Sequence, residues 1–315
     1  MLGVSMKLSI VIPVYNEQAR LGDCIKYLES QTVKPEVIFV DGGSRDNTVG
    51  VVKEAMKTNK NFRLAAEKGP KRSVANASNT GWKMAAGEIL LVTGVDTAME
   101  PDFTKKVVRE FEKHPDADLI KFYSKPMPPK RFKSPVEKAM FYKDERGEGR
   151  LLIFRTGISK TAGMYDPGLG FGDDKNFWRK VLSKEKVLDV KTELKFSKSA
   201  TLDLKGIAVR YMWYGRTMPR YLKGNKDSRT MVRAFLAAIF VILVLTFWIH
   251  PYLAYLALLM LLLPAVRGVA FGIRLYKLFG VKSPITVLPF TEILGFFFVG
   301  IGVFKYLLGD KAVGR

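Results

Sequence analysis

Carboxylate side chains are the groups of this chain that are best placed to do chemistry. Asp41 and Asp96 each end a short hydrophobic run, Glu17 follows a third run, and Asp173 and Asp174 form an adjacent pair after a glycine-rich segment. A buried carboxylate can accept a charge-assisted hydrogen bond from a nucleotide base, and carboxylate oxygens are good ligands for Mg²⁺ or Mn²⁺. Two acids whose side chains converge raise one another's pKa, which suits a general base.

Other reactive side chains are scarce. The single cysteine, Cys24, excludes an intramolecular disulfide framework, and the two histidines, His114 and His250, argue against a histidine-built zinc site. Any metal would therefore need carboxylates. The 315 residues carry 51 Lys+Arg against 30 Asp+Glu, a net charge of +21, and 48% are hydrophobic, which excludes a disordered chain. The basic excess suits anionic lipid headgroups. Because no nucleic-acid-binding motif accompanies it, no nucleic-acid partner is expected.

The carboxylates are expected at the ends of parallel strands. Short apolar runs predict strands, and segments with a helical spacing of apolar residues lie between them. The predicted strands are Leu8–Tyr15, Val37–Asp41, Phe62–Glu67 and Glu88–Asp96, and the predicted helices are Glu17–Gln31, Asp46–Lys57, Lys71–Ala86 and one opened by Pro101. This alternation predicts an α/β fold with a mostly parallel sheet, in which ligands bind outside the carboxyl ends of the strands.

Four segments resemble the motifs of one enzyme family. They are PVYNE (Pro13–Glu17), VDGGSRDNT (Val40–Thr48), SNTGWKMAAGEILLVTGVD (Ser78–Asp96) and GMYDPGLGFGDDKNFWRK (Gly163–Lys180). Their order and spacing resemble those of family 2 glycosyltransferases with the nucleotide-sugar-binding GT-A fold. With its apolar C-terminal part, the chain looks like the members that act on lipid-linked acceptors, such as polyprenyl- or dolichyl-phosphate sugar synthases.

The resemblance implies a UDP- or GDP-sugar donor, a divalent metal and inversion at the anomeric carbon. Asp41 matches the position that contacts the base, and Pro13, Tyr15 and Glu17 would line the nucleoside pocket. The alternatives are that Asp41 caps the turn that follows it and that Tyr15 belongs to the core. Gly42 stands where many members carry a second acid, and glycine suits a sharp turn.

Asp96 matches the metal ligand of the family's acidic motif. Members commonly carry two acids separated by one residue, the first of them near the ribose, but the stretch here reads Gly94-Val95-Asp96. One carboxylate, the diphosphate and waters are sufficient for Mg²⁺ or Mn²⁺, which stabilises the leaving diphosphate. Because the first acid is missing, donor affinity and metal dependence are expected to differ from those of members that have both acids. The alternative role of Asp96 is a plain cap between a strand and a helix.

Two further pairs have expected roles. Lys71 and Arg72 precede a predicted helix and are candidates for the diphosphate, because a helix start favours anions; the alternative is a solvated basic face. Asp173 and Asp174 match the family's acidic pair, whose second member is the general base. If the acceptor is a lipid phosphate that is already ionised, Asp174 mostly positions it. The alternative is that the pair caps the following helix.

Two basic segments are candidates for the acceptor. Lys121–Pro135 is rich in Pro and Lys and is predicted to be a mobile loop over the active site or on the membrane; the alternative is a solvated loop. Arg210–Gly224 mixes Arg with Trp and Tyr, which predicts an amphipathic helix at the membrane surface. The beginning of this segment only echoes the Gln-x-x-Arg-Trp motif of processive members, so a polysaccharide synthase is disfavoured. The candidate acceptor or diphosphate contacts are Lys125, Arg131, Arg210, Trp213 and Arg216.

The C-terminal part is membrane sequence. Residues 234–266 contain no Lys, Arg, Asp or Glu, and a single bilayer crossing needs roughly 20 apolar residues. Pro251 interrupts the stretch, which predicts a hairpin of two segments, 231–249 and 252–270. Both are short for a full crossing, so a re-entrant or interfacial hairpin is the alternative. A third segment, 284–308, is interrupted only by Glu292, which either has a function within the span or lies at the interface before a span that starts near residue 293.

Basic residues predict the orientation of these segments. They lie before the first segment and in the predicted loop after the second, at Arg229, Arg233, Arg267, Arg274, Lys277 and Lys282. Because short cytoplasmic loops carry excess Lys and Arg, both flanks and the preceding 230 residues are expected in the cytoplasm. The first residues, MLGVSMK, are too short and too polar for a signal peptide.

Together these features predict a cytoplasmic GT-A domain (1–200), an interfacial linker helix (201–230) and a transmembrane region (231–315). The expected activity is inverting transfer of a sugar from a UDP- or GDP-sugar to a membrane lipid, first of all polyprenyl phosphate. The alternatives are a glycan- or glycolipid-extending transferase of the same family, and a catalytically degenerate membrane protein that binds nucleotide sugar. The sequence leaves open the sugar, the base, the acceptor and the oligomeric state.

Overall fold

The structure is a computed structural model that describes residues 6–69, 72–128, 132–145, 149–170, 172–198, 204–225, 227–246 and 250–310. The chain forms two compact units. The sheet unit comprises Met1–Pro128, Glu148–Pro167 and Asp173–Ser199, and the helical unit comprises Pro129–Gly147, Gly168–Gly172 and Ala200–Arg315. Each unit is described separately.

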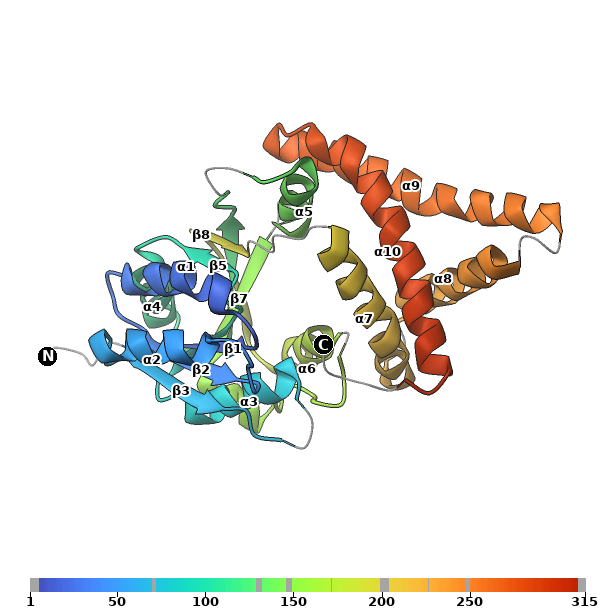
Figure 1. The fold of residues 1–315 in the computed structure, drawn as a ribbon. Helices are drawn as coiled ribbons and strands as arrows, with labels where there is room; N and C mark the ends of the chain where they lie inside the picture. The colour runs from blue at the N-terminus through green and yellow to red at the C-terminus, as the bar shows by residue number, and fades with distance from the viewer. Residues whose placement is uncertain are drawn as a thin grey trace, which may run out of the picture. The chain divides into compact units, whose positions relative to one another are not determined.

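The sheet unit is built on an eight-stranded sheet with the strand order β3-β2-β1-β4-β7-β6-β8-β5 (Figure 1). The strands are β1 (Leu8–Val14), β2 (Glu36–Asp41), β3 (Phe62–Ala66), β4 (Ile89–Val92), β5 (Thr97–Met99), β6 (Leu119–Lys125), β7 (Gly149–Arg155) and β8 (Val187–Lys198). β3, β2, β1 and β4 are parallel, as predicted, and β6 is parallel to β8. β7 is antiparallel to β4 and β6, and β5 is antiparallel to β8, so the sheet is mixed.

Helices cover both faces of this sheet. They are α1 (Gln18–Glu29), α2 (Thr48–Thr58), α3 (Val74–Met84), α4 (Phe103–Lys113) and α6 (Asp173–Lys184), with a short 3₁₀ helix at Thr156–Lys160. Alternate side chains of β1 point to opposite faces: Ile10 packs in one core cluster with residues of α1, α2 and α4, and Val11 in another with residues of α3 and α6. All of β1 except Pro13 is fully buried, which explains its continuous apolar sequence.

One glycine sets the distance between α3 and the sheet. A Cβ atom at Gly81 would lie 2.4 Å from Cγ1 of Val11 and 3.1 Å from Cγ2 of Val40. The N-terminus of α3 is fixed by Ser73, whose side chain accepts a hydrogen bond of 3.0 Å from the backbone N–H of Asn76. α3 therefore begins at a defined place beside the carboxyl ends of β1 and β2.

Two sequence predictions for the sheet unit are wrong. The predicted strand Glu88–Asp96 is too long, because β4 ends at Val92 and the residues from Thr93 to Asp96 form a turn that leads into β5. The predicted loop Lys121–Pro135 begins as a strand, since Lys121–Lys125 belong to β6 and the ring of Phe122 is fully buried. Residues 126–128, which include Pro126 and Pro128, have no regular structure. Residues 129–131 lie outside the described part of the chain.

The helical unit contains α5 (Pro135–Glu145), α7 (Leu204–Gly224), α8 (Ser228–Thr246), α9 (Pro251–Phe279) and α10 (Ser283–Leu307). α10 contacts the other four helices of the unit (Figure 1). Glycines allow these close contacts: a Cβ at Gly215 of α7 would lie 2.1 Å from the carbonyl oxygen of Val299, and one at Gly300 would lie 2.2 Å from that of Ala237. α7 is thus packed on α10 along one side.

Three helices of the helical unit are long and apolar enough to cross a membrane, namely Ser228–Thr246, Tyr252–Phe279 and Ser283–Leu307. The second exceeds the predicted segment 252–270 by nine residues. Arg267, Arg274 and Lys277, which were expected in the loop after the second segment, all lie on α9, which corrects the prediction. Proline at the start of α9 fits the first helical turn, and Gly280 ends the helix in a left-handed conformation with φ of +67°. α10 begins at Ser283, so Glu292 lies inside the helix and not before it.

Candidate active site

The loops that follow β1 and β2 are held together by reciprocal hydrogen bonds. The backbone N–H of Arg45 donates to Oδ1 of Asn16 at 2.8 Å, and the N–H of Asn16 donates to Oγ of Ser44 at 3.0 Å. The N–H of Glu17 donates to Oγ1 of Thr48 at 2.7 Å. Asn16 has a φ of +55°, a left-handed conformation that asparagine tolerates better than most residues. No role was predicted for Asn16, Ser44 and Thr48, although their clustering after two predicted strands was a signal.

Asp41 caps the turn at the end of β2. Its carboxylate accepts hydrogen bonds from the backbone N–H of Gly43 at 3.0 Å, from that of Ser44 at 3.2 Å and from Oγ of Ser44 at 2.5 Å. The alternative role considered for Asp41 is therefore present in the structure. The residue remains partly exposed, so the capped carboxylate also faces outward at the end of the strand. A group held in this way is preorganised for binding.

Arg72 lies over the ring of Tyr15, with its guanidinium carbon 3.7 Å from the ring centroid. A Cβ at Gly42 would lie 3.2 Å from Cδ of Arg72 and 3.2 Å from Oε2 of Glu67. The glycine that replaces the family's second acid thus leaves room for an arginine and another carboxylate. Tyr15 and Pro13 are partly exposed, so Tyr15 is not a core residue. Lys71 lies outside the described residues.

Glu67 is an acid of this cluster that the sequence analysis missed. It accepts a hydrogen bond of 2.7 Å from the backbone N–H of Ser73, the residue that caps α3. Burial raises the pKa of Glu67 against the lowering effects of this bond and of Arg72. Its position just after a short strand was the available signal.

Asp96 and Gly94 depend on each other. A Cβ at Gly94 would lie 2.6 Å from Oδ1 of Asp96, so the carboxylate occupies the space that a side chain at position 94 would need. Beneath this turn the hydroxyls of Thr93 and Thr97 are 2.6 Å apart. Burial, followed by the charges of Asp96 and Glu17, raises the pKa of the Cys24 thiol to about 12. Asp96 and Glu17 thus act on the same buried thiol of α1.

Asp173 and Asp174 form the first turn of α6. The backbone N–H of Asp174 donates to Oδ1 of Asp173 at 2.8 Å, and that of Lys175 donates to Oδ1 of Asp174 at 2.7 Å. The acids thus satisfy amide groups at the helix start, as in the alternative considered for them. Asp174 is exposed, which leaves its second oxygen accessible to the surface.

Tyr165 accompanies this acidic pair. Burial and the charges of Asp173 and Asp174 raise the pKa of its phenol. Its backbone is fixed to α3, because the N–H of Tyr165 donates to Oδ1 of Asn79 at 3.1 Å and Nδ2 of Asn79 donates to the carbonyl of Tyr165 at 2.8 Å. The ring centroid of Tyr165 is 4.3 Å from that of Phe177 in α6. The segment that carries Tyr165 was part of a family motif, but no role was predicted for it.

The side chains that could ligate a metal ion form only part of a metal site. Among the described residues there is no group of three or more His, Cys, Asp or Glu side chains that could hold a metal ion. The carboxylate of Asp96, in the turn after β4, has oxygen atoms of the kind that Mg²⁺ and Mn²⁺ prefer. This arrangement suits a cation that is shared with a bound diphosphate rather than one held by the protein alone.

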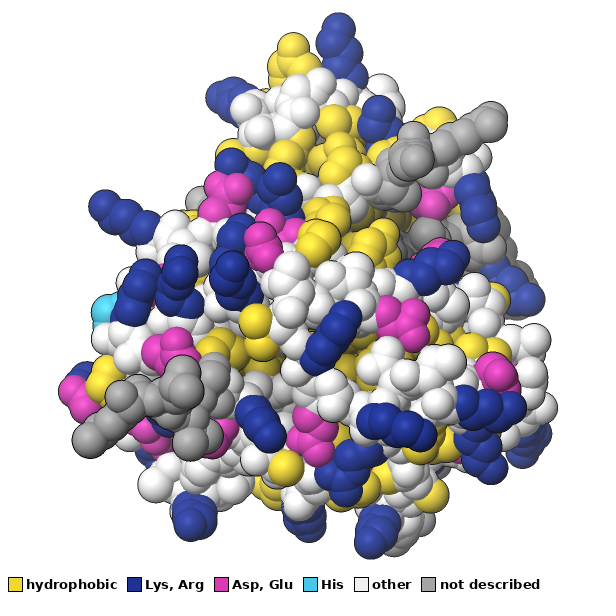
Figure 2. Space-filling view, turned by 90° about the vertical axis from the view of Figure 1, so that its left-hand side faces the viewer, with side chains coloured by type: hydrophobic (Ala, Val, Ile, Leu, Met, Phe, Trp, Pro, Cys, Tyr) yellow, Lys and Arg dark blue, Asp and Glu magenta, His cyan; other side chains and the backbone are white. Residues whose placement is uncertain are grey.

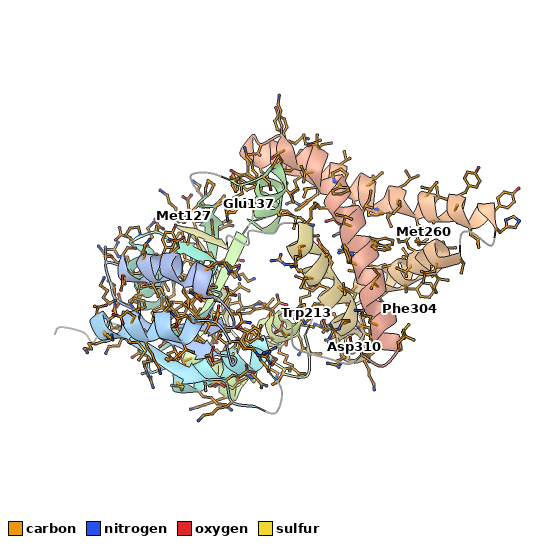
Figure 3. All side chains as sticks on the ribbon, in the orientation of Figure 1. Met127, Glu137, Trp213, Met260, Phe304 and Asp310 are labelled. Atoms are coloured by element: carbon orange, nitrogen blue, oxygen red, sulfur yellow. The ribbon has the colours of Figure 1, made fainter. Side chains whose placement is uncertain are left out.

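The predicted acceptor contacts are distributed over both units. Lys125 of β6 forms an ion pair of 2.5 Å with Glu193 of β8 in the sheet unit. Arg216 of α7 forms one of 3.2 Å with Asp310 in the helical unit. Arg210 and Trp213 also belong to α7; Figure 3 shows Trp213 on this helix and Asp310 beyond the end of α10. Arg131 lies outside the described residues. On the face seen in Figure 2, Lys and Arg side chains are spread out rather than gathered in one patch.

Comparison with known proteins identifies the family. Residues 9–165 match the family described as glycosyl transferase family 2. The dolichol-phosphate mannosyltransferase of Pyrococcus furiosus is 26% identical over 170 residues, which make up 53% of this chain and 45% of that protein. The dolichyl N-acetyl-alpha-D-glucosaminyl phosphate 3-beta-D-2,3-diacetamido-2,3-dideoxy-beta-D-glucuronosyltransferase of Methanococcus voltae is 28% identical over 109 residues, 34% of each chain.

A solved structure shares the fold. The mannosyltransferase PcManGT from Pyrobaculum calidifontis, in complex with GDP-Man and Mn²⁺, has a TM-score of 0.55 and 16% sequence identity, covering 97% of this chain and 88% of that one. The chain therefore carries a family 2 glycosyltransferase domain with a GT-A-like mixed sheet, followed by three long apolar helices. It spans less than half the length of the two curated relatives named above. The matched residues include Asp41 and Asp96, whereas Asp173 and Asp174 follow them.

Proposed function

We propose that this chain transfers a sugar, with inversion, from a UDP- or GDP-sugar to a polyprenyl phosphate in a membrane. The observation that carries the proposal is the gathering of Asp41, Tyr15, Arg72 and Asp96 in and around the loops at the carboxyl ends of β1, β2 and β4, where ligands bind in such sheets. The names of the two relatives support a dolichyl-phosphate type of acceptor, and the three apolar helices support a membrane lipid.

The donor's base and diphosphate are assigned to different groups of this cluster. Asp41 accepts a hydrogen bond from a base N–H, because its carboxylate is already fixed by three donors and charge assistance strengthens a further bond. Tyr15, with Pro13 and Glu17, borders the nucleoside. Arg72 supplies positive charge for the diphosphate and is kept over Tyr15 by the stacking contact. Lys71 is assigned to the diphosphate from the sequence alone.

Asp96 is assigned as the protein ligand of Mn²⁺ or Mg²⁺. A bound divalent ion supplies Lewis-acid stabilisation of the leaving diphosphate. Oδ1 of Asp96 lies where a side chain at residue 94 would be, so the glycine leaves the room that this carboxylate occupies. This chain's own contribution is thus a single, positioned oxygen ligand.

Asp174 is assigned as the group that receives or orients the acceptor. With a hydroxyl acceptor it takes the proton as the new bond forms at the anomeric carbon. With a phosphate acceptor, which is already largely ionised, it mainly positions the attacking oxygen. Asp173 holds the first turn of α6 in place through the N–H of Asp174. Lys125, Arg131, Arg210, Trp213 and Arg216 remain candidate contacts for the anionic acceptor or the diphosphate.

The division into regions and the orientation are also proposals. We assign the sheet unit to the cytoplasm, α7 to the membrane interface and α8, α9 and α10 to the membrane. Arg229 at the start of α8, and Lys277 and Lys282 near the end of α9, lie at the same side if α8 and α9 form a hairpin that crosses and returns. Cysteine accessibility at Arg229→Cys in sealed vesicles, in a Cys24→Ser background, tests this assignment.

Three variants test the donor site. Asp41→Asn and Asp96→Asn are expected to weaken donor binding by roughly tenfold or more each, because each removes a charge-assisted interaction. Only Asp96→Asn is expected to abolish the response of donor binding to Mn²⁺. The matched control is Asp23→Asn, since the side chain of Asp23 is 82% exposed on α1. Donor affinity and Mn²⁺ response equal to the control in both variants would refute the assigned site.

A further inference from the structure

A cluster of charged side chains lies in the helical unit. Glu292 of α10 has a side chain only 5% exposed, and its Oε1 is 2.5 Å from Nζ of Lys143 in α5. Oε2 of the same carboxylate is 3.7 Å from Arg233 of α8 and 3.9 Å from Arg267 of α9. Lys143 also donates a hydrogen bond of 2.7 Å to the hydroxyl of Tyr211 in α7. Five helices thus contribute to one cluster, which we call the Glu292 cluster.

The cluster carries more positive than negative charge. Lys143, Arg233 and Arg267 provide three cations for the one carboxylate of Glu292, an excess of two. Among the side chains that the structure describes, which do not include those of Asp144 and Glu145, no second carboxylate forms an ion pair with these cations. Like charges at such distances repel strongly in an apolar surrounding. A single carboxylate that Lys143 already satisfies does not explain why two arginines converge on it.

The two guanidinium groups are positioned to share another anion. Their distances to Oε2 of Glu292 are longer than the roughly 2.7–3.2 Å of a hydrogen bond, and in the described residues neither group donates one. Since both nitrogens lie near the same oxygen, they are at most 7.6 Å apart, the sum of the two distances. Two hydrogen bonds to different oxygens of one phosphate span about 8 Å between donors.

The open side of the cluster is apolar. The Arg267 side chain is 59% exposed and that of Arg233 is 29% exposed, while Glu292 and Lys143 lie beneath them. On α9 the exposed side chain of Leu263 lies one turn before Arg267, and the exposed Val266 directly precedes it. Gly268 lets α9 approach α10, because a Cβ there would lie 2.5 Å from Cα of Pro289. A ligand at the arginines would therefore have its charged group on the cluster and apolar atoms beside it.

We propose that the Glu292 cluster binds the phosphate monoester headgroup of a membrane lipid through Arg233 and Arg267. A phosphate monoester carries about −1.5 to −2 charges at neutral pH, which matches the excess of two positive charges. The phosphate accepts hydrogen bonds from both guanidinium groups, the lipid chain lies along the exposed apolar side chains of α9, and the Lys143–Glu292 pair supports the arginines from below. The proposal concerns lipid binding and does not depend on the transfer reaction.

The test is lipid-dependent thermal unfolding of the full chain in phosphatidylcholine nanodiscs. The added probes are phosphatidic acid or polyprenyl phosphate, both monoesters, against phosphatidylglycerol, a diester, and against inorganic phosphate. A ligand that binds only the folded state raises the unfolding temperature. Both monoesters are expected to raise it clearly more than phosphatidylglycerol, and inorganic phosphate is expected to leave it unchanged.

Variants assign the effect to the cluster. Arg233→Gln/Arg267→Gln is expected to abolish the shift caused by the monoesters, and Arg267→Gln alone to weaken their binding by about tenfold. The single variant keeps the test valid if the double variant does not fold, because Arg267 is largely exposed. The matched control is Arg229→Gln/Lys277→Gln, which removes two exposed cations from the same two helices. A wild-type shift in Arg267→Gln, an equal shift with phosphatidylglycerol, or an equal shift with inorganic phosphate would overturn the proposal.

Discussion

Replacing Gly94 by alanine tests whether this glycine is what positions Asp96. A Cβ at residue 94 would lie 2.6 Å from Oδ1 of Asp96, and such a distance is too short for a carbon and an oxygen that are not bonded. The next nearest atom to that Cβ is farther away, namely Cγ of Asp96 at 3.7 Å. The alanine variant is therefore expected to push the Asp96 carboxylate aside while the backbone of the turn stays in place.

Gly94→Ala is expected to change the free energy of unfolding much less than the affinity for Mn²⁺. A side chain forced about 30° from its preferred rotamer costs of order 0.5–1.5 kcal/mol, so unfolding is expected to change little. Displacing a group that orients a metal ligand typically weakens metal affinity by about 10–100-fold. Gly94→Ala is therefore expected to lower the Mn²⁺ affinity of the protein–donor complex by at least about tenfold, measured by titrating Mn²⁺ into the protein with a saturating nucleoside diphosphate.

Gly22→Ala is the matched control, because nothing lies within 4 Å of a Cβ at this position of α1. Alanine there should leave the Mn²⁺ affinity unchanged and stabilise the helix slightly. If Gly94→Ala bound Mn²⁺ as tightly as Gly22→Ala, the reasoning that connects Gly94 to Asp96 would be refuted. A large loss of stability in Gly94→Ala with normal Mn²⁺ affinity would also contradict it.

Three further predictions concern other parts of the sheet unit. Gly81→Ala should lower the free energy of unfolding by about 1–3 kcal/mol, since its Cβ would lie 2.4 Å from Val11 in the packed core. Chemical denaturation measures this change, and a variant as stable as wild type would contradict the close packing of α3 on the sheet. Glu67→Gln should gain stability relative to wild type as pH rises from about 4 to 7. The raised pKa of Glu67 means that the folded wild type binds this proton more tightly than the unfolded chain, so wild type loses stability as the proton leaves. A constant difference in unfolding temperature between the two proteins across this range would show that Glu67 does not titrate as described. Asp174→Asn should abolish transfer to a hydroxyl acceptor but retain some transfer to a phosphate acceptor, as measured by product formation, and wild-type rates with hydroxyl acceptors would exclude Asp174 as the base.

The parallel half of the sheet was predictable, whereas the antiparallel additions were not. β1, β2 and β4 have nearly continuous apolar sequences because they are buried on both faces, and such runs are visible without any structure. β6 lies in a stretch whose prolines and lysines predict a loop, although Phe122 is buried. Its pairing with β7 and β8 joins residues that are distant in sequence, so no local pattern reports it.

The acidic residues of the candidate site could be predicted from the sequence, but the residues that contact them could not. Asp41 ends β2 and Asp96 lies in the turn after β4, and a position just beyond a parallel strand marks both acids for ligand binding. The stacking of Arg72 on Tyr15, the place of Glu67 and the use of the space above Gly94 depend on contacts between separate loops. Glu292 was recognisable as an unusual acid in an apolar segment, yet the three cations that surround it come from three other helices.

The most direct test of the proposed function is the mass of the product formed by the detergent-solubilised full chain. The reaction would contain a panel of UDP- and GDP-sugars with polyprenyl phosphate, with and without Mn²⁺. A glycosylated polyprenyl phosphate that forms with one class of donor and depends on the divalent ion is the predicted result. Donor binding without any transfer to polyprenyl phosphate would contradict the assigned acceptor, and the absence of donor binding would contradict the donor site itself.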